Sequence, residues 1–161
     1  MNYDYVMQNQ IEIVIREMTE ENAARLRKNQ VSAGLVRLSI QYAKDVFERG
    51  FSKQMTVPPS DNTFELTEYM LLMFRQNWNE SPVRVVNVTF GKIQPRQPLQ
   101  LSLFEDADLI LRRRELDKAV DNIRSRFGYS SLLHASSLLP GAMAKQRAQL
   151  LGGHRAGENN E

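Results

Sequence analysis

The chain has 161 residues, 42% of them hydrophobic and 25% charged, which suits one compact domain plus an additional segment. It has no cysteine, which excludes disulfides and thiolate metal sites and favours a reducing cytoplasm. It has no apolar run of membrane-spanning length and no signal-peptide pattern, so we expect neither a membrane nor export. The net charge of +2 does not by itself indicate nucleic-acid binding.

The first part of the chain predicts one helix and two strands. Residues 11–30, "IEIVIREMTEENAARLRKNQ", place apolar side chains at helical spacing and basic ones at the C-terminal end. Residues 33–43, "AGLVRLSIQYA", alternate apolar and polar side chains, as a half-buried strand does. Residues 51–59, "FSKQMTVPP", predict a weaker strand that its two prolines end.

The next segments complete a domain of class α+β. Residues 60–78 predict a helix in which Asn62 and Glu65 fit a capping box. Residues 81–93, "SPVRVVNVTFGKI", predict a third strand. Because each strand has one apolar face, we expect two layers: a small antiparallel or mixed sheet of three to four strands with two helices on one face.

The other face of this sheet is expected to be polar. Its side chains form hydrogen bonds readily and include no acid: Arg37, Ser39, Gln41, Ser52, Gln54, Thr56, Asn87 and Thr89. Such side chains are common phosphate partners. Lys53, Arg84 and Lys92 lie on or beside the same strands, the last two closer to the edges of the face. The alternative is a solvated outer face, which antiparallel sheets often have.

Residues 94–105 form an extended linker with an apolar pentapeptide. Its prolines keep the chain extended, and Gln100, Leu101, Ser102, Leu103 and Phe104 follow. This pattern fits a short linear motif in which Leu103 and Phe104 enter a pocket and Gln100 fixes the register. A fourth strand or an intramolecular strap fits the same residues. The chain therefore divides into a domain at 1–93, the linker at 94–105 and a third part at 106–161.

The third part predicts a helix, residues 106–128, with an apolar stripe and a C-terminal cap at Gly128. Residues 129–139 fit a strand or a loop, a short helix is expected from Pro140, and the terminus is expected to be disordered. No nucleotide-binding loop, hydrolase motif or metal-ligand cluster occurs in the sequence, so we expect no catalysis by this chain alone, no cofactor, no metal site and no small-molecule substrate.

Several segments resemble a known family. The order of "VRLSIQY", "GFSKQMTVPP" and "PVRVVNVTFGKI" resembles the little-finger domain of Y-family, lesion-bypass DNA polymerases. The pentapeptide "QLSLF" is similar to the bacterial sliding-clamp-binding motif. The segment "RRRELDKAVDNIRSRFGYSSLLHASSLL", followed by "GGHRAG", is similar to the C-terminal ends of ImpB/MucB/SamB-type members.

The resemblance implies two partners, double-stranded template–primer DNA and the bacterial sliding clamp. Gln100, Leu101, Ser102, Leu103 and Phe104 would bind the clamp. The sheet face would grip the DNA backbone through Arg37, Ser39, Gln41, Ser52, Lys53, Gln54, Thr56, Arg84, Asn87, Thr89 and Lys92.

The family carries its catalytic Mg²⁺ in a palm domain that this chain does not contain. The resemblance therefore implies the non-catalytic C-terminal region of an error-prone polymerase of DNA repair and the SOS response, working in the cytoplasm at the nucleoid. The family opens this domain with a strand, of which only residues 1–6 could be a remnant. A free-standing adaptor that binds the clamp or another protein is the alternative. A small enzyme with an unrecognised site is a third hypothesis that nothing in the sequence supports.

Overall fold

The computed structural model describes residues 4–96 and 107–151. Along the chain come α1 (Gln8–Lys28), β1 (Val31–Tyr42), β2 (Gly50–Ser60), α2 (Thr63–Asn77), β3 (Val83–Pro95), α3 (Ala107–Phe127), η1 (Tyr129–Ser131), η2 (Ala135–Leu138) and α4 (Ala144–Leu151). The predicted order of elements is confirmed. The proposed clamp motif, residues 100–104, lies outside the described residues.

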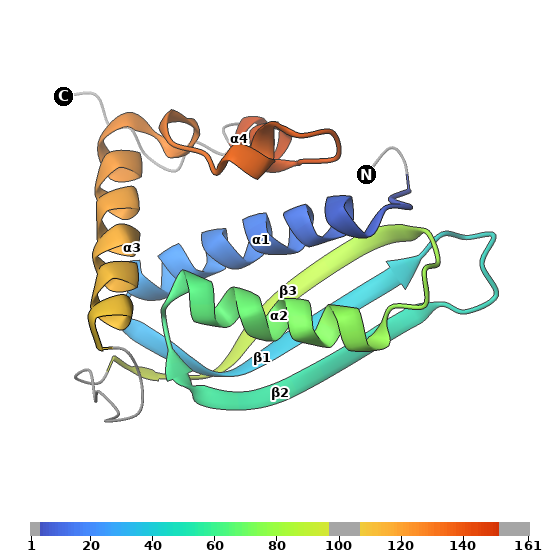
Figure 1. The fold of residues 1–161 in the computed structure, drawn as a ribbon, viewed down its shortest axis with the longest axis horizontal. Helices are drawn as coiled ribbons and strands as arrows, with labels where there is room; N and C mark the ends of the chain where they lie inside the picture. Colours follow the sequence, from blue (N-terminus) through green and yellow to red (C-terminus); the bar gives the residue numbers. More distant parts are fainter. Residues whose placement is uncertain (1–3, 97–106, 152–161) are drawn as a thin grey trace.

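The sheet is antiparallel with strand order β2-β1-β3, and α1 and α2 lie over one of its faces (Figure 1). Alternation along β1 sends Val36, Leu38 and Ile40 into the core, where they are at most 2% exposed. Helix α2 contributes its own apolar stripe to the same core, including the fully buried Met70 and Phe74. The two-layer α+β class is therefore confirmed, with three strands in the sheet.

The N-terminal segment adds one bridge to the sheet. The backbones of Tyr5 and Val83 exchange two hydrogen bonds of 2.8 Å beside β3. The Tyr5 side chain is completely buried in the core. Within the described residues, this bridge is the only pairing at the place where the resemblance implies an opening strand.

The start of α2 modifies the predicted capping box. Asn62 accepts a hydrogen bond from the Glu65 backbone N–H at 3.1 Å, as a helix N-cap does. The Glu65 carboxylate bonds to Ser60 and not to the Asn62 backbone. The Ser60 hydroxyl donates to Glu65 at 2.6 Å and accepts from the Asn62 N–H at 3.0 Å. The capping box is thus closed through a third residue.

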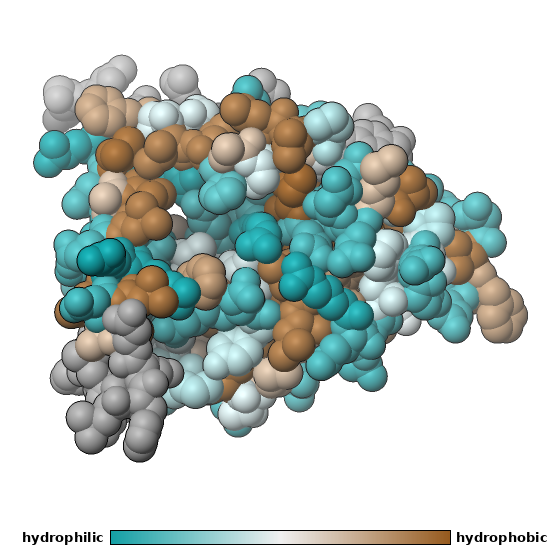
Figure 2. All heavy atoms as spheres, viewed as in Figure 1, coloured by the Kyte–Doolittle hydropathy of each residue, from teal (hydrophilic) through white to brown (hydrophobic). Residues whose placement is uncertain are grey.

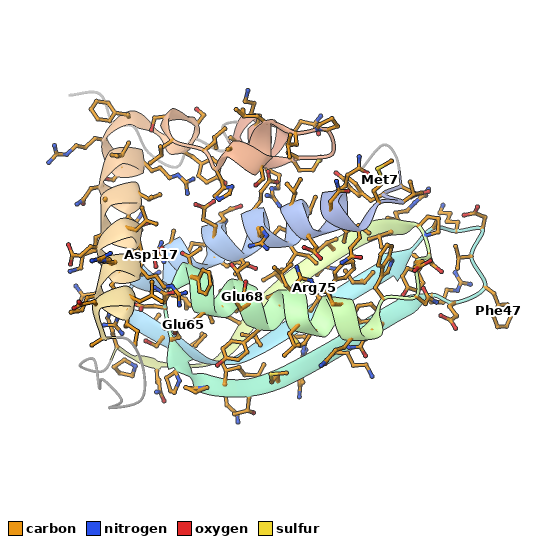
Figure 3. All side chains as sticks on the ribbon, in the orientation of Figure 1. Met7, Phe47, Glu65, Glu68, Arg75 and Asp117 are labelled. Carbon is orange, nitrogen blue, oxygen red and sulfur yellow. The ribbon has the colours of Figure 1, made fainter. Side chains whose placement is uncertain are left out.

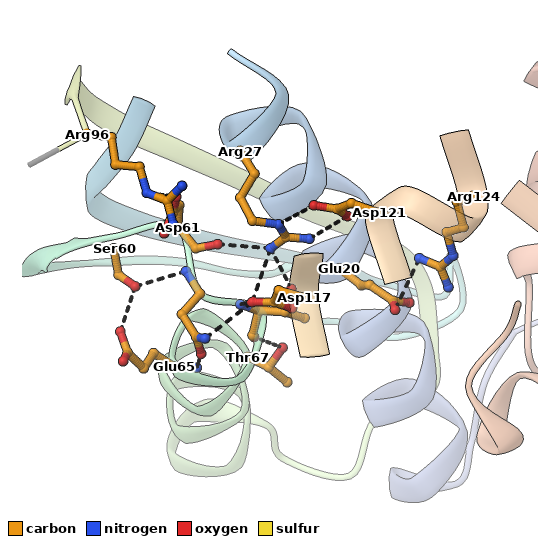
Figure 4. Close-up of polar contacts among 12 residues, drawn as sticks. Glu20, Arg27, Ser60, Asp61, Glu65, Thr67, Arg96, Asp117, Asp121 and Arg124 are labelled. Carbon is orange, nitrogen blue, oxygen red and sulfur yellow. Dashed lines mark hydrogen bonds and ion pairs between the residues drawn. The ribbon is translucent and has the colours of Figure 1, made fainter. Parts of the chain in front are cut away.

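Helix α3 is held against the domain by charge. It has no buried residue, so its predicted apolar stripe lies outside the core. Arg27 of α1, 7% exposed, donates to both carboxylate oxygens of Asp121 at 2.5 and 2.9 Å (Figure 4). The same guanidinium bonds to the Asp61 carbonyl and the Thr63 hydroxyl at 2.9 Å and lies 3.3 Å from Asp117. We call this group the Arg27 network.

The Arg27 network joins α3 to the start of α2 as well as to α1. Figure 3 shows Asp117 pointing from α3 toward the end of α2 where Glu65 lies. The Asp117 carboxylate accepts from the Thr63 backbone N–H at 3.0 Å and from the Asn62 amide at 3.2 Å. A negative charge at a helix N-terminus is favourable. Burial disfavours the charged form of Arg27, but the Asp121 hydrogen bond and the surrounding carboxylates outweigh it and raise its pKa.

The segment after α3 folds back along α1 (Figure 1). Glu17 of α1, 2% exposed, accepts from the Met143 backbone N–H and from Arg147, both at 3.0 Å. Gly128 ends α3 as predicted, with φ 87° and its N–H bonded to the Arg124 carbonyl. Two short 3₁₀ turns, η1 and η2, occupy the region that fitted strand or loop. Helix α4 begins at Ala144, four residues after the expected start at Pro140.

Candidate nucleic-acid interface

Strand register brings the predicted polar residues together on the sheet face that α1 and α2 leave open. Arg37 lies at the centre of this face, opposite Gln54 of β2 and Thr89 of β3. The next row places Ser39 between Ser52 and Asn87. Gln41 and Thr56 extend the two ends of the surface. We call this surface the polar face.

Hydrogen bonds between strands order the polar face. Nε and Nη2 of Arg37 donate to Gln54 Oε1 at 3.1 and 2.5 Å. The hydroxyls of Ser39 and Ser52 are 2.7 Å apart. Because a guanidinium has five N–H donors, about three of those on Arg37 remain free for another acceptor. Gln54 therefore orients an arginine that keeps most of its binding capacity.

Lys92 reaches the polar face by a change in backbone conformation. Alternation would send its side chain to the core side, but its φ is 48°, in the left-handed region. Its ammonium donates to the Thr56 hydroxyl at 3.1 Å, so the charge arrives on the polar face from β3. The sequence carried no signal for this redirection.

Lys53 and Arg84 do not join the other candidates. Lys53 pairs with Leu38, whose side chain is in the core, so by alternation it leaves the sheet on the helix side. Arg84 binds both carboxylate oxygens of Asp4 at 2.8 and 2.9 Å. This pairing lowers the pKa of Asp4 and raises the pKa of Arg84. Asp4 is a partner that local sequence patterns did not reveal.

The polar face carries positive charge without acids. The strand positions with this orientation are Leu35, Arg37, Ser39, Gln41, Gly50, Ser52, Gln54, Thr56, Val85, Asn87, Thr89 and Gly91. No aspartate or glutamate is among them, and Arg37 and Lys92 supply two cations. Such a surface can donate hydrogen bonds to anionic oxygens, and phosphate groups are the anions that this donor set suits.

The two ends of the linker are fixed beside the Arg27 network. At the end of β3, the Arg96 N–H donates to the Gln30 carbonyl at 3.0 Å, and its guanidinium lies 2.9 Å from the Asp61 carboxylate. After the linker, α3 is fixed through Asp117 and Asp121. The end of β3 and the start of α3, which flank residues 97–106 and the proposed clamp motif, therefore lie at the same end of the molecule (Figure 1).

The described residues show neither a metal cluster nor a membrane span. In residues 4–96 and 107–151, no three or more histidine and acidic side chains gather as metal ligands would. Among the helices described, none combines the length and the apolar character needed to cross a lipid bilayer.

Comparisons with known proteins point to one family. The family model "impB/mucB/samB family C-terminal domain" matches residues 1–103. UvrX of Bacillus subtilis (strain 168), which is named for UV-damage repair, is 35% identical over 154 residues, 95% of this chain and 36% of the relative. "DNA polymerase IV 2" of Halalkalibacterium halodurans is 29% identical over 153 residues, 94% of this chain and 37% of the relative.

A third relative agrees with the first two. "DNA polymerase IV" of Pelotomaculum thermopropionicum is 32% identical over 146 residues, 89% of this chain and 35% of the relative. The chain thus spans about a third of the length of these curated relatives. The resemblance seen in the strand order and in the C-terminal segment is confirmed: the chain belongs to the impB/mucB/samB family and carries its C-terminal domain.

Proposed function

We propose that this chain is the DNA-gripping and clamp-binding region of a lesion-bypass DNA polymerase. The observation that carries the DNA part is the polar face, an ordered, acid-free surface centred on Arg37. The family and the polymerase names of the relatives support the same assignment. Catalysis with Mg²⁺ would belong to another part of the polymerase, acting in the cytoplasm at the nucleoid. The polar face would then hold the template–primer duplex.

The proposed grip is on phosphates and independent of base sequence. Hydroxyl, amide and guanidinium donors on the polar face match phosphate oxygens. These side chains belong to the sheet surface and not to a helix or β-ribbon that could enter a groove and contact base edges. Binding should therefore depend on salt through counterion release. If Arg37, Lys92 and one further cation each neutralise a phosphate, the slope of log affinity against log salt is about −3.

A fluorescence anisotropy titration of labelled primer–template duplex tests this grip. Arg37→Ala should lower the affinity and reduce the salt slope by about 1. Arg25→Ala is the matched control, because Arg25 is an exposed arginine on α1 that is paired with Glu21. A salt-independent affinity for the wild-type chain, or equal losses in the two variants, would contradict the phosphate grip.

The clamp part of the proposal rests on the sequence "QLSLF" and on its attachment points. Leu103 and Phe104 would be the apolar anchors and Gln100 the polar residue that sets the register. Leu103→Ala combined with Phe104→Ala should abolish retention on immobilised sliding clamp. Leu111→Ala, at an exposed leucine on α3, is the control. Undiminished retention of the double variant would refute the anchor role.

An incorporation assay and the upstream coding sequence distinguish a polymerase region from a free-standing adaptor. We expect no nucleotide incorporation by these 161 residues, since catalysis is assigned to another domain. Metal-binding carboxylates of a palm domain encoded in frame upstream would support a polymerase. Their absence from the frame would favour a free-standing adaptor that binds the clamp.

A further inference from the structure

Helix α3 carries a seam with coiled-coil spacing. Its positions follow alternating steps of four and three residues, as the a and d positions of a heptad do. The positions are Leu109, Arg113, Leu116, Val120, Ile123 and Phe127, five of them apolar. We call these six residues the α3 seam. A stripe of this period is typical of a helix that packs along another helix.

The α3 seam is exposed in the described part of the molecule. Leu116 is 64% exposed and Phe127 is 73% exposed. At 100° per residue, the seam lies roughly 100° around the helix from Asp117 and Asp121. The polar contacts through Asp117 and Asp121 therefore use a different face of α3 from the seam. Figure 2 shows apolar surface along the upper half of α3 that continues onto the segment after it.

A groove extends the seam toward the body of the domain. Leu116 and Val120 form one wall of a cavity of about 370 Å³, and Phe64 of α2 lies on the other side. Leu132 and Leu133 close it from the segment after α3. The Arg113 guanidinium lies 3.5 Å from the centre of the Phe64 ring, so its aliphatic stem continues the apolar surface. The groove and the seam together can take one face of a helix.

The charge around this surface is positive. The acids of the groove are already paired within the chain: Glu17 with Arg147, Glu20 with Arg124 and Asp117 with Arg27. On the flank of the seam, Arg112 and Arg126 form no ion pair with any residue in 4–96 or 107–151, and Asp108 is the one flanking acid there that is also without one, so two cations face one carboxylate. These guanidiniums would oppose a basic partner and attract carboxylates.

We propose that the α3 seam and its groove bind an amphipathic helix of another protein, with an apolar heptad stripe flanked by aspartate or glutamate. The seam spans 18 residue steps, so the partner helix would be about 27 Å long. A second copy of α3 is a competing occupant, which the dimer measurement below distinguishes from a partner helix. The site shares no residue with the polar face or with residues 100–104, so it does not depend on the function proposed above.

Two synthetic peptides on the full chain test the proposal. Each is a fluorescein-labelled helix with leucine at the heptad a and d positions; one has glutamate at the flanking positions and the other lysine. We expect saturable micromolar binding of the glutamate peptide and at least about tenfold weaker binding of the lysine peptide. Leu116→Ser with Ile123→Ser should weaken the glutamate peptide about tenfold or more, because both side chains would lie in the contact.

Matched variants separate apolar contact, charge and competing occupants. Leu72→Ser, at a 43%-exposed leucine on α2, should leave binding unchanged. Arg112→Glu with Arg126→Glu should reverse the preference between the two peptides. Equal affinity for both peptides, or no effect of the seam variant, would overturn the proposal. A dimer of this chain that the seam variant dissolves would also overturn it, because a second copy would then occupy the seam. So would a tenfold gain in peptide affinity on Leu103→Ala with Phe104→Ala, because the chain's own linker would then be the occupant.

Discussion

Replacing Asp121 with alanine should loosen α3 while the rest of the domain stays folded. The variant removes two charge-assisted hydrogen bonds from Arg27, whose side chain is only 7% exposed. Such bonds contribute about 1.5–3 kcal/mol each, and more is lost when a buried partner is left unpaired. Asp121 is 28% exposed, and Asp117 still faces Arg27, so we expect a total near 2 kcal/mol. Because α3 has no buried residue, this loss falls on its docking.

Hydrogen exchange resolves the effect by region. A loss of about 2 kcal/mol corresponds to about 30-fold faster exchange of α3 amides that exchange through undocking. Amides of β1 should be unchanged, since the core of α1, α2 and the sheet does not contain Asp121. Lys118→Ala is the control, because its ion pair with Glu115 is exposed on the same helix. If α3 exchange in Asp121→Ala rises less than about threefold over this control, the Arg27 network does not hold α3.

Two further predictions concern the domain itself. A Cβ atom at Gly50 (φ 119°) would lie 2.0 Å from the Ile40 carbonyl oxygen, so Gly50→Ala should lower the free energy of unfolding in urea by several kcal/mol. Gly128→Ala is the control, because φ is 87° there but the Cβ would meet open space, and it should cost about 1 kcal/mol. Equal costs for the two variants would contradict the clash. The hydrogen bonds from Arg75 lower the pKa of Glu12 in the folded state. The pair therefore stabilises the fold at any pH above the pKa that Glu12 has in the unfolded chain, and this contribution is lost as the pH falls through the pKa of Glu12 in the folded state. The stability gap between wild type and Arg75→Ala should therefore shrink from pH 6 toward pH 3, and a gap that stays constant would refute this linkage.

Local patterns predicted the elements because each is decided by residues close in sequence. Period-2 alternation in β1 and β3 fixes which side chains meet the helices, and this sets the composition of the polar face. Asn62 at the start of α2 and Gly128 at the end of α3 are local as well, since a cap involves only a few neighbouring residues. The closure of the capping box through Ser60 was not predicted, although Ser60 lies only two residues before Asn62.

The contacts missed from the sequence join residues far apart in the chain. Arg27 and Asp121 are 94 positions apart, Glu17 and Arg147 are 130 apart, and each pair forms because tertiary packing places two helices together. The only local indication of these contacts was the spacing of Asp117 and Asp121, which are four residues apart and therefore lie on one face of α3. Lys92 is a third case, because alternation alone places its side chain on the wrong side of the sheet. The redirecting φ of 48° has no sequence signature.

The described residues on either side of 97–106 are fixed to the domain, and this limits how far a clamp bound as proposed could move. Phe104 is three residues from Ala107, so in any conformation it stays within about 10 Å of the start of α3. A clamp bound there could rotate relative to the domain but could not move far away from it. Helix α3 would be the point of attachment, and it is held by the Arg27 network together with the Arg124–Glu20 ion pair. Loss of Asp121 would weaken this attachment, so the angle between a clamp and a duplex bound as proposed would vary more while the motif itself is intact.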